Sequence, residues 1–129
     1  MFRVWRYLWA SPTTMVGLAV AFALIRRGQM ALVDGVIEAH GPLLARALRR
    51  LTPLAGGGAM AITLGHVVIG RDAASLEITR THERVHVRQY ELWGPLFVPV
   101  YLAAGLYAFA RGRDPYFDNR FELEARRLT

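Results

Sequence analysis

The chain has 129 residues, which is enough for one domain with a modest core and too few for two domains of ordinary size. It contains no cysteine, so disulfide bonds and thiolate ligands are excluded and any metal must be bound by His, Asp or Glu. Hydrophobic residues make up 53% of the chain and the mean hydropathy is +0.23, which argues against disorder and favours contact of part of the chain with lipid or a partner.

The net charge of +6 by itself favours an anionic partner, but its origin weakens that interpretation. All 16 basic residues are arginine, and alanine and glycine are abundant, as GC-rich coding produces without selection for charge. The arginines are also spread along the chain instead of forming one stripe with interleaved aromatic residues. We therefore expect no nucleic acid as a partner. A basic module that binds a membrane surface or nucleic acid through Arg46, Arg49 and Arg50 is the weakest hypothesis.

The first expected element is an uncharged run from Tyr7 to Ile25, with two arginines before it and two after it. This pattern is typical of a short membrane helix, and the equal flanking charges give no orientation. Ser11 followed by Pro12 indicates a helix start, so the uninterrupted helix is expected only from Pro12 to about Arg26.

We predict that residues 1–28 form an apolar helix that anchors the protein in a membrane, the bacterial inner membrane being the expected location. A helix packed on the domain is the main alternative. A signal peptide is the second alternative, because Ala19-Val20-Ala21 and Ala21-Phe22-Ala23 resemble cleavage sites. Residues 29–129 are then expected to form one domain.

Asp34-Gly35 joins two short β-branched runs and suits the positive φ angles of a type I′ turn, which predicts a β-hairpin. An amphipathic helix, a flexible break and a strand are expected to follow it. The expected ranges are Met30–Val33 and Val36–Ala39 for the hairpin, Leu43–Leu51 for the helix, Pro53 and Gly56–Gly58 for the break, and Ala59–Ile69 for the strand.

A long helix is expected from Ala73 to Trp93, with Asp72 as its N-cap and Gly94-Pro95 ending it. Leu92 to Ala110 is a second uncharged run, which either enters a bilayer or forms a buried core helix from about Pro95 to Arg111. Asp114 to Asp118 reads as a loop, and Asn119 is expected to cap a final helix.

The long helix carries His82-Glu83-Arg84-Val85-His86. Residues four apart on a helix lie one turn above each other, so both imidazoles can reach one ion. A catalytic zinc takes three protein ligands and leaves one position open for water. Glu83 lies beside His82 on the helix and is expected to act as the general base on that water. The alternative is a surface helix on which the same residues only form salt bridges.

The third ligand is expected from the last helix, which offers Glu122 and Glu124. The two side chains lie about 200° apart on a helix, so only one of them is expected to bind the ion. We predict Glu122, which lies three residues after Asn119. Gln89, one turn beyond His86, is a candidate hydrogen-bond partner for that imidazole, or else ordinary helix surface.

His82-Glu83-x-x-His86 followed by Glu122-x-x-Ala125 resembles the gluzincin metallopeptidases, including the minimal gluzincins and the membrane-embedded branch with HExxH followed by ExxAD. Arg126 departs from that branch, which has Asp at this position. The stretch from Ile62 to Arg126, about half the chain, also resembles small bacterial proteins with this motif.

The resemblance implies an α+β, zincin-like fold, with residues 29–129 as a metallohydrolase domain in which the HExxH helix packs on a small β-sheet made of the hairpin and an edge strand. An N-terminal apolar helix and a C-terminal glutamate helix complete it. The resemblance further implies that His82, His86 and Glu122 bind Zn²⁺ and that Glu83 is the catalytic base. The expected activity is zinc-dependent hydrolysis of a peptide or protein substrate.

The sequence leaves open which residue stabilises the oxyanion. Only three residues follow Arg126, so a later oxyanion ligand is not expected and Tyr116 or His66 becomes the candidate. His40 is expected to be structural.

The second hypothesis for function is a non-catalytic zinc-binding or structural membrane-associated protein, in which a fourth ligand such as His66 closes the coordination sphere. The sequence leaves the substrate and the oligomeric state open.

Overall fold

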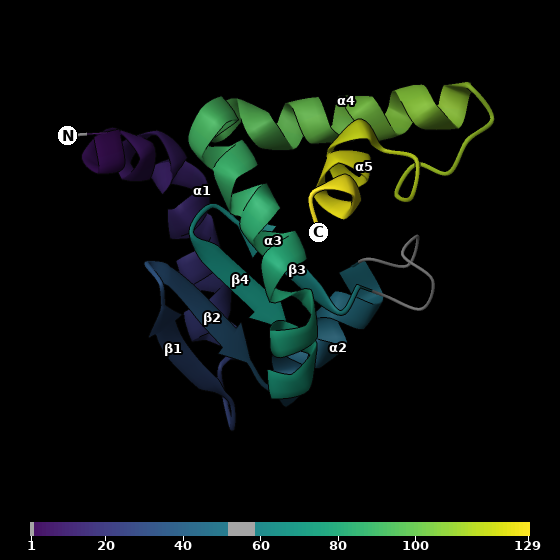
Figure 1. The fold of residues 1–129 in the computed structure, drawn as a ribbon. Helices are drawn as coiled ribbons and strands as arrows, with labels where there is room; N and C mark the ends of the chain where they lie inside the picture. The colour runs from purple at the N-terminus through teal and green to yellow at the C-terminus, as the bar shows by residue number, and fades with distance from the viewer. Residues whose placement is uncertain (1, 52–58) are drawn as a thin grey trace.

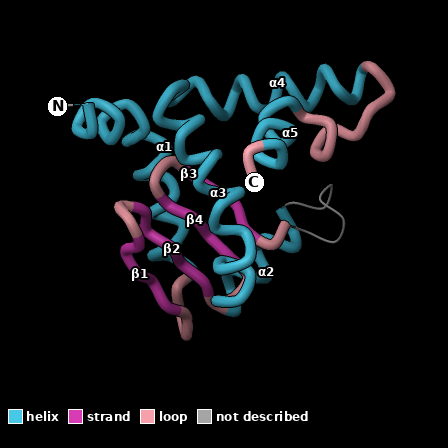
Figure 2. Tube along the Cα trace, viewed as in Figure 1, coloured by secondary structure: helices cyan, strands magenta, loops and turns pink. Residues whose placement is uncertain are grey.

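The computed structural model describes residues 2–51 and 59–129, which form an α+β arrangement of helices around a small mixed sheet (Figures 1 and 2). The expected break at Pro53 and Gly56–Gly58 lies outside the described residues. The elements in chain order are α1 (Phe2–Leu24), β1 (Gln29–Val33), β2 (Val36–His40), α2 (Pro42–Leu51), β3 (Ala61–Leu64), β4 (Val67–Gly70), α3 (Ala73–Trp93), the short 3₁₀ helix η1 (Gly94–Leu96), α4 (Phe97–Ala110) and α5 (Arg120–Arg127).

Helix α1 begins at Phe2, so the prediction that it starts at Pro12 is wrong. A proline inside a helix has no N–H to donate to the carbonyl four residues earlier. Here the hydroxyl of Ser11 donates to the Leu8 carbonyl oxygen over 2.7 Å. That carbonyl is therefore satisfied, and the helix continues through Pro12.

One face of α1 carries small side chains and packs against the β3–β4 hairpin. Thr13, Gly17 and Ala21 are buried on this face. A Cβ added at Gly17 would lie 2.9 Å from the Cβ atoms of both Leu64 and Val67, so only glycine permits this approach. The helix is thus packed on the domain along one face while its opposite face stays exposed.

The sheet has the strand order β1-β2-β4-β3, in which β2 and β4 are parallel and the other pairs antiparallel. The predicted β1–β2 hairpin is confirmed, because Asp34 and Gly35 both have positive φ angles, of 50° and 79°. The prediction of one strand from Ala59 to Ile69 is wrong. Gly65, with φ of 65°, turns the chain and splits this run into β3 and β4.

The apolar run misled the sequence interpretation because β4 is buried along its whole length and shows no alternation. Two layers of helices cover the sheet. Helices α1 and α2 pack on one face through Ala21, Leu44 and Leu48, and α3 packs on the other through Leu76 and Val87. Figure 1 shows α3 crossing the sheet on the side away from α1.

Helix α3 has the predicted bounds, with the Asp72 carboxylate accepting a hydrogen bond from the Ser75 N–H over 2.7 Å and Gly94 ending the helix at φ of 59°. It is joined to the sheet by charge: Arg80 and Arg84 both donate to the buried carboxylate of Glu38 on β2, over 2.9 and 3.0 Å. These contacts fix which side of α3 faces the sheet.

After η1 the chain turns sharply, so that α4 runs across the far end of α3, and α5 lies beneath α4 (Figures 1 and 2). Within α4, only Phe97, Gly105 and Ala108 are buried, so the alternative of a buried core helix for this run is wrong. Asn119 caps α5 as expected, its side-chain oxygen accepting from the Phe121 N–H over 3.0 Å.

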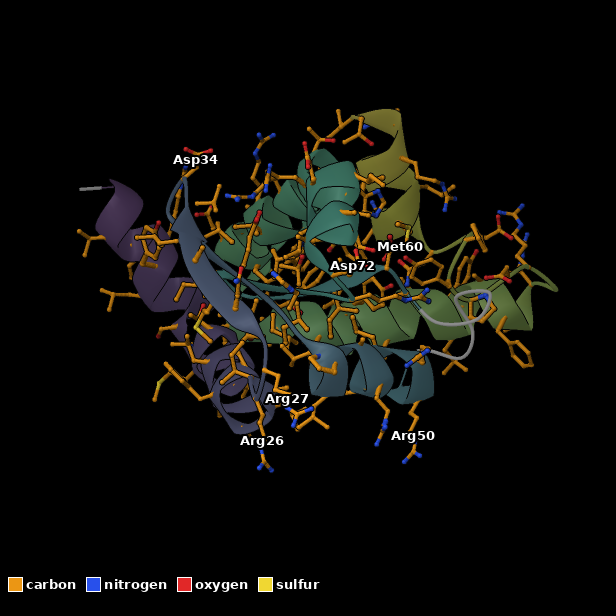
Figure 3. The ribbon with its side chains drawn as sticks, turned by 90° about the horizontal axis from the view of Figure 1, so that it is seen from below. Arg26, Arg27, Asp34, Arg50, Met60 and Asp72 are labelled. Atoms are coloured by element: carbon orange, nitrogen blue, oxygen red, sulfur yellow. The ribbon has the colours of Figure 1, made fainter. Side chains whose placement is uncertain are left out.

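In the part of the chain that the structure describes, two segments are long and apolar enough to cross a membrane: Val4–Leu24, near the N-terminus, and the stretch Ala73–Ala110. An N-terminal segment of this kind is also compatible with a signal sequence. On a different part of the surface, Arg46, Arg49 and Arg50 are exposed on α2. Figure 3 shows Arg26, Arg27 and Arg50 extending outward from the same side of the molecule.

Candidate metal centre

Three side chains from two helices converge on a common point. His82 and His86 come from successive turns of α3, and Glu122 comes from the first turn of α5. Glu122 Oε1 lies 3.0 Å from His82 Nε2 and 3.0 Å from His86 Nε2, and the two nitrogens are 3.3 Å apart. Among the described residues, these three form the one group of His, Asp or Glu side chains with the spacing of a metal site.

The size of this triangle fits a first-row metal ion. Tetrahedral zinc, with bonds of about 2.0–2.1 Å, holds its ligand atoms about 3.3–3.4 Å apart. The observed sides of 3.0, 3.0 and 3.3 Å come close to that value. Two imidazole nitrogens and one carboxylate oxygen also form a donor set that zinc prefers.

Gln89 determines which nitrogen of His86 carries the hydrogen. The amide nitrogen of Gln89 donates to the Phe121 carbonyl and to Glu124, over 3.2 and 3.1 Å. Its amide oxygen is therefore left to accept from His86 Nδ1, 2.8 Å away. The expectation that Gln89 partners His86 is confirmed.

This assignment leaves Nε2 of neutral His86 as a lone pair directed at the carboxylate oxygen of Glu122. Two electron-rich atoms 3.0 Å apart need a cation between them, either a proton or a metal ion. With a proton alone, burial lowers the pKa of His86 but the hydrogen bond and charge of Glu122 prevail and raise it to about 9. Burial has the opposite effect on Glu122 and raises its pKa, but the hydrogen bonds from His82 and His86 outweigh burial and bring the pKa of Glu122 down to about 2.

Glu83 lies between the two histidines in sequence and faces the same cavity as His86 and Glu122. Its carboxylate is buried and accepts a hydrogen bond of 2.6 Å from the Thr63 hydroxyl on β3. Burial raises the pKa of Glu83, and the neighbouring histidines only partly offset that effect. The carboxylate is thus held beside the cluster but outside it.

Two residues at the site were missed by sequence reasoning. Tyr101 on α4 donates its hydroxyl hydrogen to Glu122 Oε2 over 2.6 Å, which leaves Oε1 for the two histidines. Thr63, the partner of Glu83, comes from the edge strand. A hydroxyl inside the otherwise apolar run around Tyr101 was the available signal, but no local pattern links either residue to the histidines.

Two other residues considered from the sequence, Glu124 and His66, lie outside the cluster. Glu124 is exposed and contacts Gln89, so Glu122 is the glutamate that joins the histidines. His66 lies in the turn between β3 and β4, and not on a strand as expected. Its ring pairs with Glu91 over 2.9 Å and stacks on Tyr7, away from the cluster. Its proposed roles as a fourth ligand or oxyanion donor therefore have no structural support.

Tyr116 lines the cavity that contains Glu83 and His86, so it keeps its candidacy as an oxyanion donor. His40 lies at the end of β2.

Comparison with protein-family models, with curated proteins and with solved structures finds no match to this chain. The interpretation of the site therefore depends on its own geometry.

Proposed function

We propose that this protein is a zinc-dependent hydrolase with a zincin-like active site that cleaves an amide bond. The observation that carries the proposal is the triangle of His82, His86 and Glu122, with a buried carboxylate, Glu83, directed into the same cavity. The set contains two nitrogen ligands, one oxygen ligand and a separate base, which are the parts required for hydrolysis at zinc.

Each side chain has a distinct role in this proposal. Bound at His82, His86 and Glu122, zinc would supply a Lewis acid for the substrate carbonyl and acidify a water molecule. Glu83 accepts a proton from the attacking water and returns it to the leaving amine. Thr63 holds the Glu83 carboxylate in place, and Gln89 and Tyr101 orient His86 and Glu122.

We further propose that the protein works at a membrane, held there by the outer faces of α1 and α4. Helix α4 has 14 residues, about 21 Å in length, which is shorter than the ~30 Å hydrocarbon core. It is therefore expected to lie in the interface and not to cross it. Exposed apolar side chains on α1, on α4 and at the α3–η1 junction beside them support the proposal: Val4, Trp5, Leu8, Phe22, Leu92, Leu96, Leu102, Leu106 and Phe109.

A non-catalytic zinc site is the alternative function. A structural zinc is enclosed by four protein ligands, whereas a catalytic zinc leaves one position open. Within residues 2–51 and 59–129 the donor group has three members, and the cavity adjoins it. Both features favour hydrolysis over a closed structural site.

Metal analysis of the purified protein is the first test. Wild type is expected to bind one zinc ion per chain, and His86→Ala is expected to lose it. His40→Ala is the matched control, because it removes a histidine outside the cluster and should leave the zinc content unchanged. Equal zinc content in wild type and His86→Ala would refute the metal centre.

The second test separates metal binding from catalysis. Glu83→Gln keeps the shape of the side chain but cannot act as a base, so it is expected to retain zinc and lose turnover by several orders of magnitude. Amide hydrolysis measured by mass spectrometry on a pool of peptides and acylated amides is the readout. Full activity in Glu83→Gln would exclude the assigned base.

A further inference from the structure

A cavity of about 780 Å³ adjoins the candidate metal centre, a size in the usual range for small-molecule sites. Its metal-binding and ionisable side chains Glu83, His86 and Glu122 come from α3 and α5. The walls formed by β3 and α4 are almost entirely apolar, with Ile62 and Leu64 on one side and Leu102 and Leu106 on the other. The cavity is therefore a hydrocarbon-lined cleft that has the metal ligands on one wall.

Most of the other polar side chains that line the cleft are already engaged. Thr63 donates to Glu83 and Tyr101 donates to Glu122. Asn119 donates to the Tyr101 carbonyl and accepts from the Phe121 N–H. A chain of peptide groups in this cleft would find few free side-chain partners, and each buried peptide group left unpaired weakens binding by roughly tenfold. A hydrocarbon chain carries no such groups.

The α4 wall of the cleft continues onto the outer surface of the molecule. Leu102, Leu106 and Phe109 line the cleft, yet their side chains are 63%, 69% and 66% exposed. The same residues belong to the face of α4 assigned above to the bilayer. An apolar chain can therefore pass from lipid into the cleft along α4 without crossing water.

We propose that the substrate is an amide of a long-chain fatty acid, whose acyl chain lies between β3 and α4 with its carbonyl at the metal centre. The inference rests on the proposed hydrolase function and specifies its substrate class. In the reaction, the oxygen of water bonds to the acyl carbonyl carbon and the C–N bond breaks. Glu83 passes one proton of the water to the nitrogen, and the amine also takes up the second, so the products are a fatty carboxylate and a protonated amine.

A series of fatty hydroxamates tests the cleft separately from the metal. Acetohydroxamate, octanohydroxamate and dodecanohydroxamate share one zinc-binding headgroup and differ only in chain length. They are titrated against zinc-loaded protein in lipid nanodiscs, and affinity is referred to the aqueous hydroxamate concentration. We expect affinity to rise by about fourfold per methylene until the chain fills the cleft.

The matched variants lie on the same helix. Leu102→Gln with Leu106→Gln makes the cleft wall polar and is expected to abolish most of the chain-length dependence. Tyr107→Gln is the control, because Tyr107 is 64% exposed on α4 but does not line the cleft. It should behave as wild type. Zinc content measured in all three proteins shows that the metal centre is intact.

A photoreactive hydroxamate gives a second readout that needs no variant. With a diazirine at the end of its acyl chain, it is expected to label β3 or α4 residues of the cleft in wild type, as mapped by mass spectrometry. Labelling confined to other elements would overturn the proposal. The fatty-amide proposal would also be overturned if all hydroxamates bound with equal affinity, or if affinity depended on chain length equally in wild type and in the cleft variant. Neither result would refute the hydrolase function.

Two further outcomes bear on the substrate class and on the hydrolase function. Tighter binding of a peptidyl hydroxamate than of dodecanohydroxamate would overturn the acyl substrate in favour of a polypeptide one. Failure of every hydroxamate to bind, together with absence of stoichiometric zinc, would refute the hydrolase function itself. The two failures are therefore distinguishable.

Discussion

At the scale of single residues, the site depends on side chains that hold the three donors in a fixed orientation. Gln89 accepts from His86 Nδ1, and Tyr101 donates to the second oxygen of Glu122. Partners of this kind fix the tautomer of a ligating imidazole and the direction of a ligating carboxylate. Much of the affinity for metal is therefore expected to reside outside the three ligands.

Gln89→Leu tests this expectation. The variant loses the acceptor for His86 Nδ1, so the imidazole is free to rotate and to change tautomer. We expect a 10- to 100-fold lower zinc affinity with an unchanged stoichiometry of one at saturating zinc. Competition with a chromophoric chelator measures the affinity. Arg88→Leu, an exposed neighbour on α3, serves as the control, and an equal loss in both variants would contradict a positioning role for Gln89.

At the scale of elements, α1 is the helix whose role the sequence left open. Its small face lies against the β3–β4 hairpin, and three hydrogen bonds join α1 to that hairpin, to the β1–β2 turn and to α3. The Tyr7 hydroxyl donates to the Gly35 carbonyl, the His66 N–H donates to Thr14, and the Trp9 ring N–H donates to the Leu92 carbonyl. We therefore expect α1 to contribute to the stability of the domain beside any contact with lipid.

Gly17→Val and Ala19→Val form a matched pair for this expectation. Both place valine on α1, but residue 17 is buried against the hairpin and residue 19 is exposed. We expect Gly17→Val to lower the free energy of unfolding by about 1–3 kcal/mol, because the new side chain overlaps Leu64 and Val67. Ala19→Val should change it by less than about 1 kcal/mol. Equal effects in denaturant titrations would mean that α1 is only a tether.

The ion pairs between α3 and β2 make the stability of the domain sensitive to acid. The hydrogen bond from Arg80 lowers the pKa of Glu38 below its usual 4.5, burial opposes this shift, and Arg84 adds to the lowering. A carboxyl with a depressed pKa stabilises the fold above its unfolded pKa, and that contribution is lost as the pH falls through the folded pKa.

Glu38→Gln removes this contribution. At neutral pH we expect the variant to be less stable than wild type by about 1–3 kcal/mol, since two guanidinium groups lose a charged acceptor. The difference between the two proteins should shrink as the pH falls below about 4.5, where the wild-type carboxyl also becomes protonated. Denaturant titrations at neutral and acidic pH measure it. A difference that does not vary with pH would contradict the assignment.

At the scale of the whole molecule, apolar side chains are unevenly distributed over the surface. Leu92 is 76% exposed and Leu96 is 55% exposed at the junction of α3 and α4, close to the N-terminal half of α1 (Figure 1). Side chains of this size lose the favourable free energy of burial when they face water. We expect this end of the molecule to contact lipid.

Flotation with liposomes tests the orientation. Wild type is expected to float with the vesicles, and Leu92→Gln with Leu96→Gln is expected to weaken binding by roughly tenfold per leucine. Ile78→Gln is the control, because Ile78 is 70% exposed near the start of α3, at the other end of that helix. Loss of flotation in the control but not in the double variant would place the membrane at the opposite end.

Features set by neighbouring residues could be predicted from the sequence. Asp72 and Gly94 mark the ends of α3, Asn119 caps α5, and Asp34-Gly35 forms the hairpin turn, because each acts on backbone groups only a few positions away. The spacing of His82 and His86 on one helical face follows from helix geometry in the same way.

Features that depend on contacts between distant segments were decided by the tertiary structure alone. The sequence favoured Glu122 over Glu124, but its approach to the histidines follows from the docking of α5 on α3 and α4, where Phe121 packs against Phe97 and Tyr101. The partners Thr63 and Tyr101 come from β3 and α4, 20 and 21 residues away from the carboxylates they contact. Local patterns carry no information about such docking, because side chains far apart in sequence meet only when the hydrophobic surfaces of their elements are buried together.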